Sequence, residues 1–93
     1  NHTAALIWAA HHGTLQEVQA VLKKQPDVNV VDEHGMSALH FAANAGHIDV
    51  VRALVSAGAN VNIADQHGST PVHWAAANCH LDVVHALLQA KAD

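Results

Sequence analysis

The sequence predicts an all-α solenoid, in which helical units are stacked and each unit packs mainly against its neighbours. The first observation is an internal repeat at a spacing of 33 residues: residues 32–35 (Asp-Glu-His-Gly) align with residues 65–68 (Asp-Gln-His-Gly), and about half of the following positions are identical. A repeat of this length is typical of solenoids. The second observation is a composition that is 51% hydrophobic but only 13% charged. We therefore expect much of the apolar surface to be buried between units.

Each unit carries signals for an inner and an outer helix. Ser37 and Thr70 stand at N-cap positions, and Pro71 follows at the first helical position, where its missing N–H costs nothing. These signals predict inner helices over residues 38–45 and 71–78. Gly46 is expected to end the first of them in the left-handed conformation. Apolar residues at helical spacing then predict an outer helix from Ile48 onward.

Three positions depart from the glycines of the repeat. Cys79 stands where Gly46 stands in the preceding unit, and Gln25 and Lys91 replace Gly58. Where these backbones keep a positive φ, each substitution is expected to cost about 1 kcal/mol.

The two ends of the stack differ in polarity. In the first unit Glu17 replaces the apolar residue found at Val50, as expected for a solvent-facing cap. The last unit keeps Val83 and Leu87, so we expect apolar surface beyond it, available for a further unit or for self-association through this C-terminal face. The residues expected to be buried are Leu6, Ala9, Ala42, Leu54, Ala75 and Leu87.

The spaced pattern Asp-x-x-Gly-x-Thr-Pro-Val-His-x-Ala-Ala over residues 65–76, followed by His-Leu-Asp-Val-Val over residues 80–84, resembles the ankyrin repeat. The link Gly-Ala-Asn-Val-Asn over residues 58–62 belongs to the same pattern. The resemblance implies three units, at about residues 1–31, 32–64 and 65–93, in a single domain over residues 1–93. It implies an ankyrin-repeat stack of helix-turn-helix units with projecting β-hairpin fingers, here at about residues 28–36 and 61–69, and usually a role in binding other proteins.

Charge and cysteine content argue against several classes of function. The formal net charge is −4, and Lys23-Lys24 is the largest basic cluster, so we expect no nucleic-acid partner. No apolar run reaches the roughly 18 residues of a membrane span, so we expect no membrane partner. A single cysteine, Cys79, excludes an internal disulfide. It fits a reducing compartment, and we expect an intracellular location, cytoplasmic or nuclear.

Trp8, Phe41 and Trp74 occupy equivalent positions in the three units. They are interpreted either as an exposed aromatic platform or as core residues packed between the two helices of each unit. The core interpretation is favoured because each ring precedes an Ala-Ala pair and large aromatic side chains gain most from burial.

The ten histidines do not form a convincing metal or catalytic site. His40 and His73 match the histidine of the repeat that hydrogen-bonds within its turn. His11-His12 is interpreted as the exposed end of the first inner helix rather than a metal site. Cys79 lies beside a histidine, but no third catalytic group is implied. We therefore expect no enzyme activity, no metal and no cofactor.

The expected function is recognition of another protein by a concave surface made of finger tips and exposed inner-helix ends. Alternatives are a structural segment of a longer repeat array and a substrate of an asparaginyl hydroxylase. Asn62, with Leu54 eight residues earlier, resembles the acceptor pattern of that enzyme. The predicted partner-binding residues are His11, His12, Glu33, His34, Met36, Asn44, Ala45, Gln66, His67, Ser69, Ala77 and Asn78.

Overall fold

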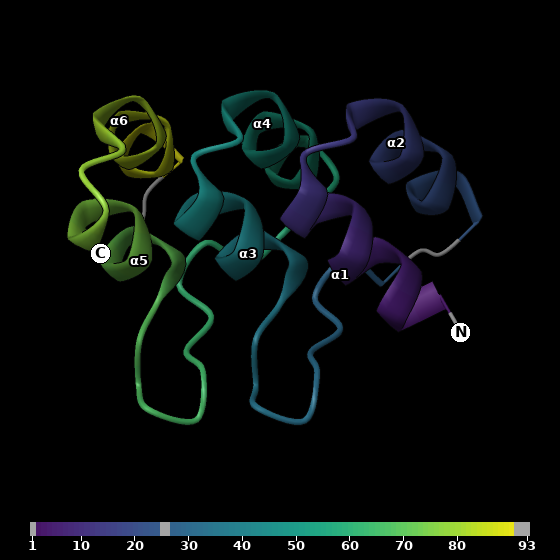
Figure 1. Ribbon diagram of the computed structural model, residues 1–93, viewed down its shortest axis with the longest axis horizontal. Helices are drawn as coiled ribbons and strands as arrows, with labels where there is room; N and C mark the ends of the chain where they lie inside the picture. Colours follow the sequence, from purple (N-terminus) through teal and green to yellow (C-terminus); the bar gives the residue numbers. More distant parts are fainter. Residues whose placement is uncertain (1, 25–26, 91–93) are drawn as a thin grey trace.

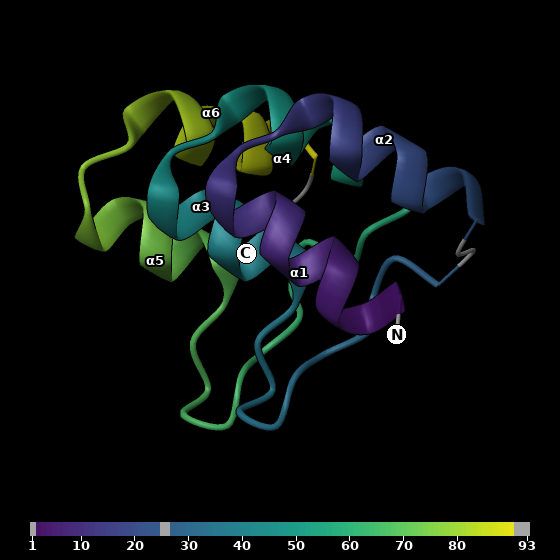
Figure 2. The ribbon, with the colours of Figure 1, turned by 45° about the vertical axis from the view of Figure 1, so that its right-hand side comes forward.

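The computed structural model describes residues 2–24 and 27–90, with side chains from residue 5 onward. Within these residues, six helices form three antiparallel pairs that stack side by side (Figure 1). The inner helices α1, α3 and α5 form one layer, and the outer helices α2, α4 and α6 form the other (Figure 2). The helices are α1 (His2–His12), α2 (Leu15–Lys24), α3 (Ala38–Ala45), α4 (Ile48–Ser56), α5 (Pro71–Ala77) and α6 (Leu81–Gln89).

The inner helices begin where their caps predict. Ser37 and Thr70 both have extended backbones, and each forms a capping box with the histidine three residues later. Pro71 occupies the first turn of α5, and Gly46 ends α3 with φ 77°. These features confirm the predicted inner helices, except that α5 ends at Ala77, one residue before the predicted end.

Two long loops, the fingers, project from the inner-helix layer (Figure 1). The prediction of β-hairpin fingers is not supported, because the described residues contain only an isolated bridge between Val31 and Ser37. A polar side chain competes for the backbone donors at the tip. One carboxylate oxygen of Asp32 accepts hydrogen bonds from the backbone N–H groups of His34 (2.8 Å) and Met36 (3.0 Å). The fingers are therefore side-chain-stabilised turns.

The core runs through all three helix pairs. The six residues expected to be buried are all at most 1% exposed, which confirms that prediction. Alanines at the contacts of α1 with α3 and of α3 with α5 let the inner helices approach closely. Cys79 has φ 60°, so it adopts the left-handed backbone expected at this position. Gln25 and Lys91 lie outside the described residues.

Histidines connect adjacent units. The buried His40 accepts a hydrogen bond at Nδ1 from the Ser37 N–H (3.0 Å), and its Nε2–H donates to the Ser69 carbonyl in the next unit (2.9 Å). His47 Nε2 donates to the His11 carbonyl (3.2 Å), and His80 Nε2 donates to the Asn44 carbonyl (3.0 Å). The turn role predicted for His40 is confirmed, and the bonds between units add a second role.

Candidate functional site

Each inner helix, together with the C-cap residue Asn78 in the last unit, leaves three positions at spacing i, i+3 and i+4 exposed or partly exposed. In α3 the positions on either side of Phe41 are buried, whereas Phe41, Asn44 and Ala45 remain partly exposed. Side chains at this spacing share one helix face. We call the equivalent positions of the three units the inner-helix strip, which consists of Trp8, His11, His12, Phe41, Asn44, Ala45, Trp74, Ala77 and Asn78.

The core interpretation of the three aromatic residues is wrong for Trp8, which is 51% exposed, and holds only in part for Phe41 and Trp74, which are partly buried. The buried positions are taken by the alanines that follow, such as Ala42. One residue along a helix turns a side chain by about 100°, so the preceding ring lies toward the open side. The sequence signal for this exposed face is the position of each aromatic residue one place before the Ala-Ala pair of its helix.

Contacts along the strip cross from unit to unit. Within the first unit, the rings of Trp8 and His12 stack with centroids 4.2 Å apart. The His11 ring then makes an edge-to-face contact with Phe41 of the second unit, with centroids 5.4 Å apart. Farther along, Asn78 Nδ2 donates to Asn44 Oδ1 at 2.6 Å. The predicted residues at the inner-helix ends therefore form one continuous surface. Trp8, Phe41 and Trp74 extend this surface, although the sequence analysis had assigned them to the core.

The predicted finger residues form a second patch. The tips are joined by a hydrogen bond from the Gln66 N–H to the His34 carbonyl (3.1 Å). Met36 and Ser69 lie at the finger bases and are partly buried. The exposed tip residues are Glu33, His34, Gln66 and His67.

The finger and helix patches meet at Trp74. A hollow of about 490 Å³ runs from finger to helix end, and its lining includes His67, Ser69, Trp74 and Ala77. The Trp74 indole N–H donates to one carboxylate oxygen of Asp65 (3.2 Å), which anchors the ring against the finger. In this unit the structure thus brings the two predicted patches together around a residue that was not predicted to belong to the site.

Hydrogen bonds stabilise the ionised form of the Asp65 carboxyl group. Burial would raise the pKa of this carboxyl, but donation from the backbone N–H groups of Ser69 and His67 and from the Trp74 indole lowers the pKa below its ordinary value of 3.8. Donors to a carboxylate favour its charged form. Asp65 therefore remains an acceptor for Trp74 at neutral pH.

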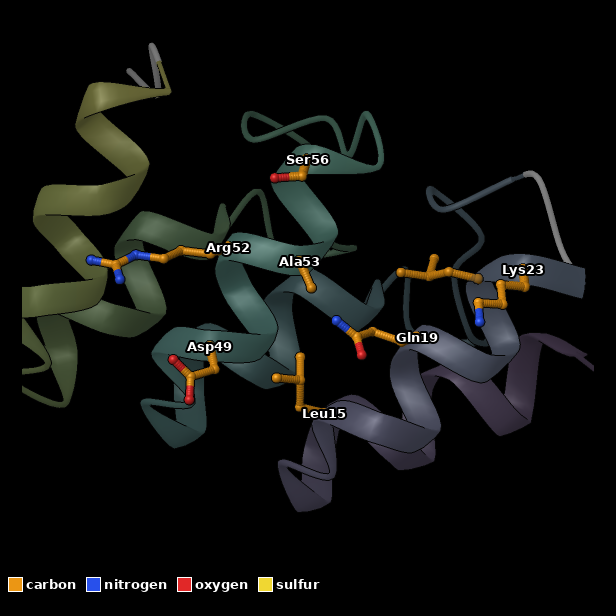
Figure 3. A pocket seen from close by; sticks show the side chains of 8 residues that line it. Leu15, Gln19, Lys23, Asp49, Arg52, Ala53 and Ser56 are labelled. Carbon is orange, nitrogen blue, oxygen red and sulfur yellow. The ribbon is translucent and has the colours of Figure 1, made fainter.

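A second hollow, of about 640 Å³, lies on the other layer, between α2 and α4 (Figure 3). Leu15 and Ala53 contribute apolar lining, and Asp49 lies at one side. The basic groups of Arg52 and Lys23 lie at opposite ends of this groove and do not converge (Figure 3). The groove is the larger hollow, but it carries separated charges of both signs, whereas the inner-helix strip carries none.

Other predicted features have simple surroundings. Asn62 is exposed in the link between α4 and α5, and its backbone N–H donates to Asn60 Oδ1 (3.0 Å). No group of three His, Cys, Asp or Glu residues within residues 2–24 and 27–90 is placed to hold a metal ion. In the same part of the chain, no helix has the length and apolar character needed to cross a membrane.

Comparison with known proteins agrees with this architecture. A family model described as "Ankyrin repeats (3 copies)" matches residues 6–93. A search of curated proteins found no match to the chain.

Proposed function

Because the chain belongs to the ankyrin repeat family, whose members are generally protein-interaction modules, we propose that it binds a partner protein through the inner-helix strip and the finger tips. The observation that carries the proposal is the continuous row of exposed groups from Trp8 to Asn78, which crosses all three inner helices. Binding is its function, and no catalytic role is assigned to the chain.

The chemistry of the strip supports recognition of a protein. Tryptophan is enriched among the residues that dominate binding energy at interfaces, and Trp8 is half exposed. The strip contains no Lys, Arg, Asp or Glu, so covering it does not require desolvation of a permanent charge. The groups stand on packed helices, so little ordering is needed when a partner binds.

The proposal is tested by affinity capture with two matched triple variants as bait. In the first, Trp8→Ala, His11→Ala and Asn78→Ala remove exposed groups from the strip. In the second, Arg52→Ala, His85→Ala and Gln89→Ala remove exposed groups from the outer helices. A specific partner should be captured by the unmodified protein and the outer-helix variant but not by the strip variant. Loss of the partner only with the outer-helix variant would assign binding to the outer-helix layer instead.

A second candidate function, as a structural segment of a longer array, is favoured by apolar side chains in the last helix. Leu81 is 75% exposed and Leu88 is 52% exposed. The exposure of these two leucines also supports self-association through this C-terminal face. Sedimentation velocity of the chain across a range of concentrations distinguishes self-association, which shifts the sedimentation coefficient upward, from an unpaired face, which does not.

Asn62 remains a candidate for hydroxylation, supported by its exposure and by the resemblance of its surroundings to an acceptor pattern. Incubation with an asparaginyl hydroxylase should add the mass of one oxygen atom. The Asn62→Ala variant is the control, because an unchanged mass gain in that variant would exclude this site.

A further inference from the structure

The C-terminal side of the third unit repeats a surface that is covered one unit earlier. His40 and Ala43 face the third unit and are fully buried. Their equivalents, His73 and Ala76, are exposed. We call this side the distal face, which consists of Val72, His73, Ala76, Cys79, Val84 and Leu88.

The distal face presents hydrogen-bonding groups that are satisfied one unit earlier. His40 Nε2 donates to the Ser69 carbonyl across the boundary between units, whereas His73 Nε2 has no partner among residues 2–24 and 27–90. His73 keeps the same capping box at its other nitrogen, so its ring is held in the orientation that His40 has. The face thus presents a directed donor as well as apolar groups.

The finger beside this face is also uncovered. A Cβ built on Gly35 would lie 3.0 Å from the backbone nitrogen of Gln66, because the second finger packs against the first. A Cβ built on Gly68 would meet nothing within 4 Å. The hollow of about 490 Å³ lined by Gly68, His73 and Trp74 lies where a third finger would pack.

Cys79 restricts what can cover the face. The His47 ring lies on Gly13 and the His80 ring lies on Gly46, where an added Cβ would be only 2.6 and 2.7 Å from a ring nitrogen. Both rings also hydrogen-bond to carbonyls of the unit that they cover. Cys79 occupies the equivalent position with a real Cβ. A following histidine would therefore have to move away and lose that hydrogen bond.

We propose that the distal face binds a further helix-turn-helix unit of the same repeat geometry, whose outer helix begins with a small residue in place of histidine. Such a unit would supply a backbone carbonyl to His73 Nε2 and place its finger in the hollow beside Gly68. This interface meets the inner-helix strip only at Trp74 and Ala77, which line the hollow, and its other groups lie outside the strip. Protein recognition by the strip is therefore not required for it.

A second copy of this chain fits the face less well. Its first unit has Thr14 at the start of the outer helix, which is small enough to lie over Cys79. However, Glu17 stands where Val50 and Val83 are buried against the preceding unit. Head-to-tail stacking would bury this carboxylate against the apolar face, which is costly without a paired charge. The observations therefore favour a distinct unit with an apolar residue at that position.

The test appends one unit, copied from residues 61–93, to the C-terminus of the full chain. In one version the copied equivalent of His80 is retained, and in the other it is replaced by threonine. The threonine version should melt at least about 5 °C above the unextended chain. The histidine version should melt about 5 °C or more below the threonine version, because overpacking at the Cys79 contact destabilises the interface.

The rescue variant Cys79→Gly tests whether the Cys79 side chain is what excludes a histidine at the start of the next outer helix. In this background the histidine version should melt as high as the threonine version, because the ring again lies on a glycine. Equal melting temperatures of the two versions with Cys79 present would overturn the proposed restriction. A threonine version that melts no higher than the unextended chain would overturn the proposal that the face accepts a unit.

Thiol labelling gives an independent readout. Cys79 is exposed in the chain, so it should react readily with a maleimide. When the copied cysteine of the appended unit is replaced by glycine, Cys79 is the single thiol of the extended protein. Stacking of the threonine version should then slow the reaction at least about tenfold. An unchanged labelling rate would contradict stacking on this face. Concentration-dependent dimerisation of the unextended chain that is abolished by Leu88→Lys would instead assign the face to a second copy.

Discussion

The second and third units have nearly the same pattern of residues but different surroundings. The second unit, α3 and α4, is covered on both sides, whereas the third unit, α5 and α6, is covered by described residues only on one. His40 is consequently buried with both ring nitrogens hydrogen-bonded, whereas His73 is exposed with one. The comparison shows that a residue at a given position of the repeat is buried only when a neighbouring unit covers it, whatever the residue type.

The largest expected difference between the two units is at their histidines. His40→Ala should lower the free energy of unfolding by about 3 kcal/mol, because it leaves the Ser37 N–H and the Ser69 carbonyl unsatisfied in a buried interface. His73→Ala, the matched control, should cost less than about 1 kcal/mol. Urea denaturation of both variants measures the difference. Equal losses would mean that the third unit is as tightly covered as the second.

The next difference is at the left-handed residue between inner and outer helices. Gly46→Cys should cost about 2 kcal/mol, because a Cβ there meets the His80 ring in addition to the strain of the positive φ. The reverse change, Cys79→Gly, meets no covering ring and should stabilise by about 1 kcal/mol, the cost of the strained backbone. Thermal and urea unfolding measure both changes, the loss of stability in Gly46→Cys and the gain in Cys79→Gly. A loss of stability in Cys79→Gly would show that the thiol makes a contact more valuable than the strain it imposes.

A smaller difference concerns the finger carboxylates. Asp65 accepts from the Trp74 indole, whereas Asp32 has Phe41 at the equivalent position, which has no N–H to donate. Asp65→Asn should therefore cost about 1 kcal/mol more at pH 7 than Asp32→Asn. Urea denaturation of the two variants at pH 7 measures this difference, and equal losses would contradict a stabilising role for the indole bond.

The same contact predicts a pH dependence with a definite sign. The folded pKa of Asp65 lies below its ordinary value of 3.8, so its contribution to stability is present above pH 4 and is lost as the pH falls through the folded pKa. Asp65→Asn should flatten the decline in stability below about pH 4. An unchanged acid limb in this variant would show that other groups control acid unfolding.

Much of the fold follows from local sequence signals. Ser37, Thr70, Pro71 and Gly46 mark helix ends through backbone geometry that depends on few distant contacts, so their roles were predictable. The finger structure was not, because the Asp32 carboxylate satisfies N–H groups that a strand ladder would otherwise use.

The candidate site was only partly predictable. The inner-helix ends follow from the helical period, but the exposure of Trp8 depends on which face of α1 its neighbours cover. An aromatic residue beside an Ala-Ala pair resembles a core residue in composition alone. Its position one residue away from the buried alanine, a rotation of about 100°, is what places it on the strip.

Intrinsic tryptophan fluorescence tests the central claim most directly, because both tryptophans of the chain, Trp8 and Trp74, lie on the inner-helix strip. After a partner has been captured, a tryptophan-free fragment of it is titrated into the protein, and acrylamide quenching is measured before and after saturation. If the strip is the binding face, quenching should fall on binding, and Trp8→Ala should weaken binding by about tenfold or more. Unchanged quenching at saturation, with Arg52→Ala as the weakening substitution, would contradict the account.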